Sequence, residues 1–284
     1  MYYIEKVDKL CGINKIIKTV KIQENRIIIP ANNIGELKEK QIIKLANKTD
    51  KILQKVHSKK IVLSKELYKL ETYKNILYSS GYDITDGKWL FEAISYKILD
   101  YIANKKDIKK EETTLSVLVN NLTDYTLENI KIFAKNFKTL NIVTNHIDKF
   151  KNIVDKIYED EGVIITVTNN KRKSLIKSKI IFNIDFPKEL LNKYNIFDEA
   201  IIVNINGNMK INKKRFNGLI INDYEIRINP QAIQSYTGNI ENYYIKQLYE
   251  AEFYQNIPFY DFNKKVKADG LEICGLYGIN GKIL

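Results

Sequence analysis

The chain has 284 residues, of which 44% are hydrophobic and 28% charged, and its formal net charge at pH 7 is +12. Four prolines and twelve glycines exclude collagen-like and low-complexity classes, and an aromatic content of 11% argues against disorder. A chain of this length forms one large domain or two modest ones.

The positive charge comes almost entirely from lysine, with 42 Lys and only 4 Arg beside 47 Ile and 31 Asn. A/T-rich coding produces this skew whatever the function. Arginine is the preferred residue for bidentate contacts with phosphate and guanine, so its scarcity argues against dedicated reading of a DNA sequence. A solvated basic surface is therefore the favoured interpretation of the charge, and nonspecific nucleic-acid binding is the alternative.

The cysteines and the start of the chain bear on localisation. Cys11 and Cys274 are too far apart in the sequence for a CxxC metal or redox motif, and so few cysteines favour a reducing compartment. Glu5 and Asp8 stand where a signal peptide needs an apolar core, and there is no run of about 18 apolar residues to span a membrane. We expect a cytoplasmic protein that does not insert into a membrane.

Residues 1–108 mix strand and helix patterns. The predicted strands lie at 2–7, 26–30 and 60–63, and the predicted helices lie at 35–56 and 67–77. A further helix is capped by Thr85 or Asp86, and Trp89 lies on its apolar face. The polar run 104–112 interrupts the apolar pattern and marks a boundary.

The stretch 113–208 alternates short apolar runs with helix patterns. The apolar runs predict five strands, at 115–119, 140–143, 163–167, 180–184 and 200–203. The runs show little internal alternation, which is typical of strands with both faces covered, and the βα order predicts a parallel sheet with right-handed crossovers. We therefore predict an α/β fold, with a Rossmann-like, mainly parallel sheet domain inserted in or following a smaller α/β lobe.

The predicted domains are an N-terminal α/β lobe at 1–108, the Rossmann-like domain at 109–208 and a C-terminal segment at 209–284. In the C-terminal segment, 219–221 and 224–228 predict a hairpin or meander. Residues 239–254 predict a helix, and 271–284 predict a final strand–turn–strand. Neither the first nor the last part has an obvious complete core, so we expect them to pack together.

Polar side chains gather directly after the predicted strands. Parallel sheets bind ligands at the carboxyl ends of their strands, near a switch in strand order, so we expect these side chains to share one edge. The Asn, Thr and Asp residues among them are also explained singly as helix caps or turn formers. The ligand-binding candidates are Asn120, Asn121, Thr123, Asp124, Thr144, Asn145, His146, Asn169, Asn170, Lys171, Arg172, Ser174 and Asp185.

The segment 169–174 is the sharpest local feature. It combines a strand end, the cations Lys171, Arg172 and Lys173, and a predicted helix start. Free backbone N–H groups and the helix dipole favour an anion at such a place, and Ser174 would add a hydroxyl. A phosphate or carboxylate ligand is one interpretation, and an exposed basic turn without a partner is the other.

His146 directly follows the second predicted strand. It could act as a general acid or base, with Asp185 as its proton-transfer partner if the two loops meet. A ring packed at a helix start is the competing interpretation. With two histidines and two distant cysteines we predict no metal site. No residue pair identifies a reaction, so the question of enzymatic activity stays open.

On this βα pattern, residues 113–208 resemble the Rossmann-type cofactor domains of the shikimate dehydrogenase and glutamyl-tRNA reductase kind. The resemblance implies NAD or NADP as cofactor. The turn 119–124, VNNLTD, departs from it, because no glycine lets the backbone approach a pyrophosphate. The second strand ends in Thr144, Asn145 and His146 instead of the acid that holds an NAD ribose. NAD(P) binding would have to do without the glycine loop.

We therefore expect a cytoplasmic α/β protein whose degenerate Rossmann-like domain binds an anionic small molecule or nucleotide. The missing glycine loop favours one alternative, a non-catalytic regulatory or interaction protein. The charge and the 19 tyrosines favour another, a nonspecific nucleic-acid binder.

Overall fold

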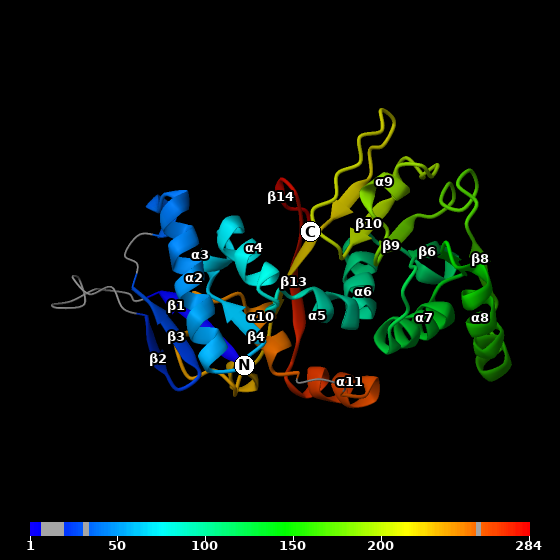
Figure 1. The fold of residues 1–284 in the computed structure, drawn as a ribbon. Coiled ribbons are helices and arrows are strands. Elements are labelled where there is room, and N and C mark those ends of the chain that lie inside the picture. Colours follow the sequence, from blue (N-terminus) through cyan, green and yellow to red (C-terminus); the bar gives the residue numbers. More distant parts are fainter. Residues whose placement is uncertain (7–19, 31–33, 254–256) are drawn as a thin grey trace. The chain divides into compact units, whose positions relative to one another are not determined.

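The computed structural model describes residues 1–6, 20–30, 34–253 and 257–284 (Figure 1). Contacts divide the chain into a first unit, Met1–Gly87 with Ile228–Ile257, and a second unit, Lys88–Arg227 with Pro258–Leu284. Cys11 lies outside the described residues. Within the described ranges, every helix is too short or too polar to cross a membrane. The domain boundaries expected after residues 108 and 208 stay a prediction.

The first unit is built on a five-stranded sheet. Its strands, in order across the sheet, are β2 (Lys21–Gln23), β3 (Arg26–Ile29), β1 (Tyr2–Lys6), β4 (Lys60–Leu63) and β5 (Asp83–Ile84). Only the β2–β3 pair is antiparallel. One face packs against α2 (Glu39–Lys55), α3 (Lys65–Tyr68), α4 (Glu71–Ser79) and the 3-10 helix Ile34–Glu36. Ile4 and Ile27 of the sheet share this core with Leu53 and Leu77 of the helices, because alternate strand residues point to one side.

The other face of this five-stranded sheet packs against residues from late in the chain. The segment 228–253 contains the 3-10 helices Pro230–Ala232 and Ile240–Asn242 and the helix α10 (Ile245–Ala251). Tyr236 Oη donates a hydrogen bond of 2.7 Å to Glu5 Oε2, and Arg26 Nε lies 3.3 Å from Glu5 Oε1. The ring of Tyr3 lies 4.7 Å from that of Tyr236. This buried polar and aromatic cluster ties the late segment to β1 and β3.

The second unit contains a six-stranded sheet in which every neighbouring pair is parallel. Its strands, in order across the sheet, are β11 (Leu219–Ile221), β10 (Ile201–Asn204), β9 (Ile180–Asn183), β6 (Thr114–Leu118), β7 (Thr139–Val143) and β8 (Ile165–Thr168). Numbered by their order along the chain and read from β8 to β11, the strands are third, second, first, fourth, fifth and sixth, which is the order of dinucleotide-binding folds. The predicted mainly parallel, Rossmann-like sheet and its α/β class are confirmed.

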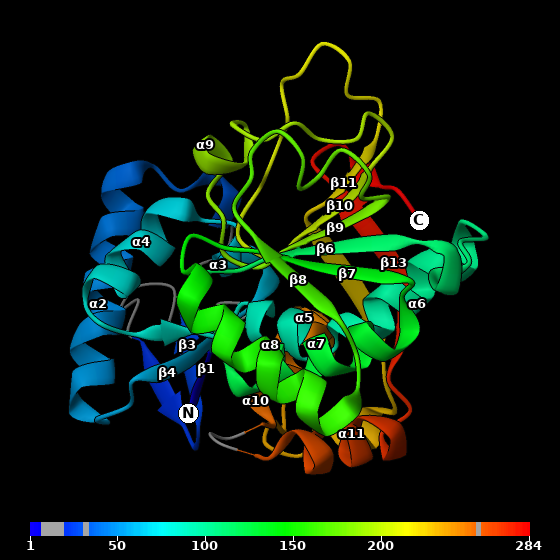
Figure 2. The same ribbon diagram turned by 90° about the vertical axis from the view of Figure 1, so that its right-hand side faces the viewer.

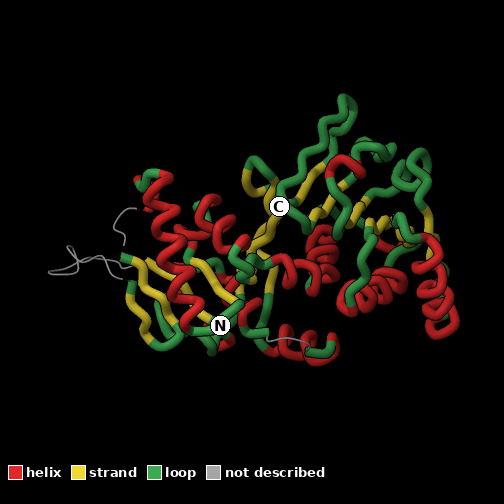
Figure 3. Tube along the Cα trace, viewed as in Figure 1, coloured by secondary structure: helices red, strands yellow, loops and turns green. Residues whose placement is uncertain are grey.

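The two faces of this sheet are covered differently (Figure 2). On one face lie α7 (Asp124–Asn136) and α8 (Ile147–Glu161), and the ring of Phe133 is 5.9 Å from that of Phe182 in β9. The other face is covered by the connections 169–179, 184–200 and 205–218, whose one helix is α9 (Lys188–Leu191) and which are largely loop in Figure 3. Leu175 and Leu191 from these connections share a core with Ile181 of the sheet.

The rest of the second unit comprises α5 (Lys88–Ala93), α6 (Ser95–Lys105), the 3-10 helix Lys110–Glu112, α11 (Phe259–Ala268) and a small antiparallel sheet of β12 (Asp223–Arg227), β13 (Glu272–Gly278) and β14 (Gly281–Lys282). Trp89 packs as predicted, with its ring 5.1 Å from Tyr125 and 5.5 Å from Phe262. The final strand–turn–strand is confirmed as β13 and β14.

The predicted hairpin of 219–221 with 224–228 is wrong. Residues 219–221 form β11, the sixth parallel strand, and β12 pairs with β13 instead. Asn222 alone separates β11 from β12, and one residue is too short for a hairpin loop. The Asn222 backbone N–H donates to Tyr277 O at 2.8 Å, so the chain passes at this point from one sheet to the other.

Candidate functional site

The loops after β6, β7, β8 and β9 lie at one edge of the sheet, because these strands are parallel and adjacent. All thirteen predicted ligand-binding residues lie in these loops or at their ends. The strand order reverses between β6 and β9, the place where open α/β sheets bind ligands. Whether these residues bind a ligand stays a prediction, and the contacts below show what each of them does in the structure.

Asp185 connects the loop after β9 to the loop after β6. Its Oδ1 accepts a hydrogen bond from Asn120 N at 2.8 Å, and its Oδ2 accepts from Asn121 N at 2.7 Å and from Asn121 Nδ2 at 3.2 Å. Dinucleotide-binding folds offer the backbone N–H groups of this first loop to a pyrophosphate. In this chain they hold the protein's own carboxylate.

The same loop is joined to the one after β7. Asn120 Oδ1 accepts from Asn145 N at 2.9 Å, and Thr144 Oγ1 accepts from His146 N at 3.1 Å. Thr144 is fully buried, whereas Asn145 and His146 are exposed. His146 is the residue before α8 and makes no side-chain cap. Between the described residues Asp185 and His146 no hydrogen bond forms, so the proton-transfer pair stays a hypothesis.

The start of α7 is satisfied by protein groups. Thr123 Oγ1 accepts from Thr126 N at 3.0 Å, the cap that the sequence offered as the alternative to a ligand. The hydroxyls of Thr123 and Thr126 both donate to Glu92 Oε1. Sequence reasoning missed Glu92, because it lies in α5, more than thirty residues earlier, and no local pattern links the two helices. Asp124 is exposed in the first turn of α7.

The predicted helix start at 169–174 is wrong. The segment is a turn, and the chain continues through an isolated bridge between Leu175 and Ile196 to β9. Asn170 Oδ1 accepts from Arg172 N at 3.0 Å and from Lys173 N at 3.1 Å, an Asx turn that takes the backbone donors expected to meet an anion. An anion at this turn would therefore be held by side chains alone.

The side chains around this turn divide into an inner and an outer set. The buried Ser174 Oγ donates to Asn170 O at 2.5 Å, so the hydroxyl stabilises the turn. Asn169, Lys171, Arg172 and Lys173 are exposed. The three cations form no ion pair within the described ranges. The candidates Lys171 and Arg172, together with their neighbour Lys173, are therefore cations whose side chains remain available to an anionic partner.

Three asparagines that the sequence analysis did not single out as ligands end adjacent strands. Asn183 Nδ2 donates to Asn204 Oδ1 at 2.8 Å, and Asn204 Nδ2 donates to Asn222 Oδ1 at 3.1 Å. Asn222 also accepts from Met209 N at 2.8 Å and donates to Met209 O at 3.0 Å. These contacts explain part of the polar strand edge as structural, because the amides join the ends of β9, β10 and β11 and hold the turn after β10.

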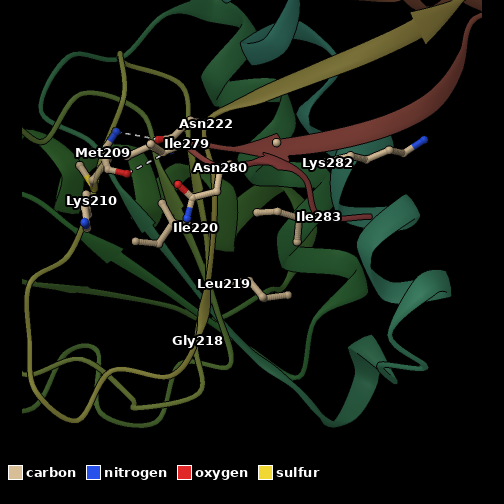
Figure 4. A pocket seen from close by; sticks show the side chains of 12 residues that line it. Met209, Lys210, Gly218, Leu219, Ile220, Asn222, Ile279, Asn280, Lys282 and Ile283 are labelled. Carbon is tan, nitrogen blue, oxygen red and sulfur yellow. Dashed lines mark hydrogen bonds between the residues drawn. The ribbon is translucent and has the colours of Figure 1, made fainter.

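A cavity of about 280 Å³ lies elsewhere in the second unit, along β11 and the turn between β13 and β14 (Figure 4). Leu219, Ile220 and Ile283 give it apolar walls, and Lys210 also lines it. Lys282 also belongs to the lining, but its Nζ donates to Cys274 O at 3.0 Å. None of the thirteen candidates lines this cavity. Among the described residues no cluster of three His, Cys, Asp or Glu suits a metal ion.

Comparison with known proteins gives no family. No protein-family model matches the chain, and no curated protein matches its sequence. Among solved structures, L-tryptophan dehydrogenase from Nostoc punctiforme is 7% identical, with a TM-score of 0.29, over 62% of this chain and 49% of that one. The A chain of dipicolinate synthase from Bacillus subtilis is 11% identical, with a TM-score of 0.33, over 70% and 60%.

A third likeness is to D-mandelate dehydrogenase from Rhodotorula graminis, at 9% identity and a TM-score of 0.34, over 93% of this chain and 94% of that one. This chain spans about half the length of the tryptophan dehydrogenase and less than two thirds of the dipicolinate synthase chain. Likenesses this distant assign no activity, and the fold class rests on the observed strand order.

Proposed function

We propose that the second unit binds a small anionic molecule, such as a nucleotide, at the carboxyl edge of its parallel sheet. The strand order supports this most directly, because β6, β7 and β8 are neighbours and their loops share one edge. Lys171, Arg172 and Lys173 are exposed there with no ion-pair partner in the described ranges, and His146 is exposed in the neighbouring loop. Cations at such an edge suit phosphate or carboxylate groups.

Asp185 decides where the anionic group of that ligand sits. Its carboxylate already accepts from the backbone of Asn120 and Asn121, so a second anion at that position would meet both steric exclusion and charge repulsion. The ligand's phosphate or carboxylate is then expected on the side chains of Lys171 and Arg172. This favours a ligand with one compact anionic group over a dinucleotide whose pyrophosphate lies on the first loop.

A thermal-shift panel of ATP, AMP, NAD, NADP and inorganic phosphate tests the proposal. At least one organic anion should raise the Tm, and the K171A/R172A variant should bind it roughly ten-fold or more weakly, because two charge-assisted contacts are lost. The control K177A/K179A removes the same charge from exposed positions in the same connection and should bind normally. No shift with any compound, or equal losses in both variants, would contradict the proposal.

The variant Lys210→Ala tests whether the small anion binds at the carboxyl edge of the sheet or in the cavity. It changes the one cation of the cavity lining whose side chain has no hydrogen bond in the described ranges, and it should leave small-ligand binding unchanged. A larger loss with Lys210→Ala than with K171A/R172A would move the site to the cavity and overturn the assignment to the carboxyl edge.

A non-catalytic regulatory or interaction role is the second candidate. The observation that favours it is the filled first loop, in which Asp185 takes the backbone donors that the pyrophosphate of a cofactor would need. Tight association with NAD or NADP, measured by calorimetry, would exclude this alternative.

A further inference from the structure

The loop-rich face of the second unit's sheet carries most of the chain's net charge. Residues 169–218, which include its three connections, hold eleven Lys and Arg against four Asp and Glu, a net charge of +7 out of +12. These residues make up less than a fifth of the chain. We call the exposed part of 169–179, 184–200 and 205–218 the crossover surface. Its cations are Lys171, Arg172, Lys173, Lys177, Lys179, Lys188, Lys193, Lys210, Lys213, Lys214 and Arg215.

The opposite face of the same sheet has no such excess. Residues 124–161, which contain α7 and α8, hold six Lys against seven Asp and Glu, a net charge of −1. A lysine-rich composition would raise the charge of both faces alike. The difference between two faces of one sheet is therefore not explained by composition.

Hydrogen bonds between the connections hold the crossover surface together. Asn195 N donates to Lys171 O at 2.7 Å, Phe197 N to Leu175 O at 3.1 Å and Asn217 N to Asp198 O at 2.8 Å. The connections therefore form one layer and present their charges together.

Several cations of this layer are available to a partner, whereas Lys213 is half-buried and donates to Tyr194 O. Lys177, Lys179, Lys214 and Arg215 are exposed, and none of them forms an ion pair within the described ranges. Unneutralised cations on one layer raise the local positive potential and attract polyanions.

We propose that the crossover surface binds the phosphate backbone of nucleic acid without sequence preference. A nucleic acid offers closely spaced charges along an extended chain, which matches cations spread over three connections. Nine of the eleven cations are lysines, whose ammonium groups act as point charges on phosphates rather than as bidentate readers of bases. The one helix of the surface, α9, has four residues, too few to read a major groove.

An anionic membrane is the competing partner for such a surface. Stable interfacial binding needs apolar side chains that enter the lipid, in addition to cations. Ile176 is the one large apolar side chain of 169–218 that is exposed, at 41%. The surface therefore fits a nucleic acid better than a lipid.

Fluorescence anisotropy with labelled single-stranded DNA, duplex DNA and RNA of about 25 nucleotides tests the proposal, at about 50 mM and about 200 mM NaCl. Binding should weaken steeply with salt and depend little on sequence. The variant K177E/K179E/K214E/R215E should bind roughly ten-fold or more weakly, with a smaller salt dependence. The control K138E/K149E/K151E/K156E makes the same change of charge at exposed positions of the opposite face and should bind within about three-fold of the wild type.

Equal losses in the two variants would show that net charge alone drives binding and would overturn the proposal. Binding to phosphatidylserine vesicles with none to oligonucleotides would overturn it as well. If charge reversal impairs folding, K214A/R215A gives the same readout with a smaller loss. The four reversed positions are not candidates for the small-ligand site, so a nucleotide-induced Tm shift should survive in the variant, and each proposal can fail without the other.

Discussion

Asp185 shows how one side chain determines what a familiar sheet topology can hold. The loop after β6 keeps the backbone donors that suit an anion, and the carboxylate of Asp185 satisfies them from the loop after β9. The sequence placed Asp185 at the correct edge, because parallel strands bring their carboxyl ends together. It could not show the contact, because the partners are backbone N–H groups, which no residue pattern reveals.

Asp185→Ala should destabilise the protein by about 2–3 kcal/mol, because it leaves two backbone donors without their acceptor. Inorganic phosphate should restore part of the lost Tm in this variant and have less effect on the wild type, since the vacated position suits an anion. Urea denaturation with and without phosphate measures both. Asp198→Ala is the matched control, because Asp198 is exposed and its side chain forms no hydrogen bond in the described residues. A phosphate effect of equal size in both variants would contradict the expectation.

Helices and strands differ in how well local sequence predicted them. The strand at 60–63 has the predicted bounds, and the strands predicted at 115–119 and 180–184 form within one residue of them. Short apolar runs of β-branched residues between polar turns are a strong local signal. The helix expected after 169–174 does not form, and the chain instead passes through a turn and the bridge between Leu175 and Ile196. The helix α11 was missed, although Phe259, Phe262 and Val266 recur at helical spacing.

The start of α7 provides a test at the level of one element. Thr123→Ala should cost about 1 kcal/mol, the usual loss for a helix N-cap, whereas Thr123→Ser keeps the oxygen and should cost less. Glu92→Ala should also destabilise the protein. Because both residues act on the same helix end, the double variant should lose less than the sum of the single losses. Additive losses in urea denaturation would argue that the two contacts act independently.

The two units were only partly visible in the sequence. The parallel sheet followed from five apolar runs in regular order, whereas the grouping of late residues depends on long-range contacts. Residues 228–257 belong to the first unit and 258–284 to the second. No change of composition marks position 228. Tyr236 joins the first unit through Glu5 and Tyr3, partners more than two hundred residues away that no local pattern reveals.

Buried tyrosines make the first unit sensitive to alkaline pH. Burial, with a hydrogen bond to Asp50, raises the pKa of Tyr82 to about 12, and burial also raises the pKa of Tyr73, Tyr236 and Tyr243. The folded state therefore prefers the neutral phenols. Their contribution to stability is complete below the unfolded pKa of about 10 and is lost as pH rises from there through the folded pKa.

The free energy of unfolding should accordingly fall as the pH rises above about 10. Urea denaturation at a series of alkaline pH values measures this fall. Tyr82→Phe removes one of the shifted groups and should make the decline shallower, although it also loses the 2.8 Å hydrogen bond to Asp50 Oδ1 and starts from a lower stability. A decline of unchanged slope in the variant would exclude Tyr82 as a contributor.

Three backbone hydrogen bonds link the connections 169–179, 184–200 and 205–218 to one another, in addition to the bonds within each connection, whereas α7 and α8 are held by their own internal bonds. Helices of that kind open turn by turn from their ends, whereas these connections have to open together. Their amide protons should therefore exchange with solvent as one cooperative group, ahead of the strands beneath them. A single proteolytic cut near residue 212 should accelerate exchange at Asn195 and Phe197, which lie on a different connection.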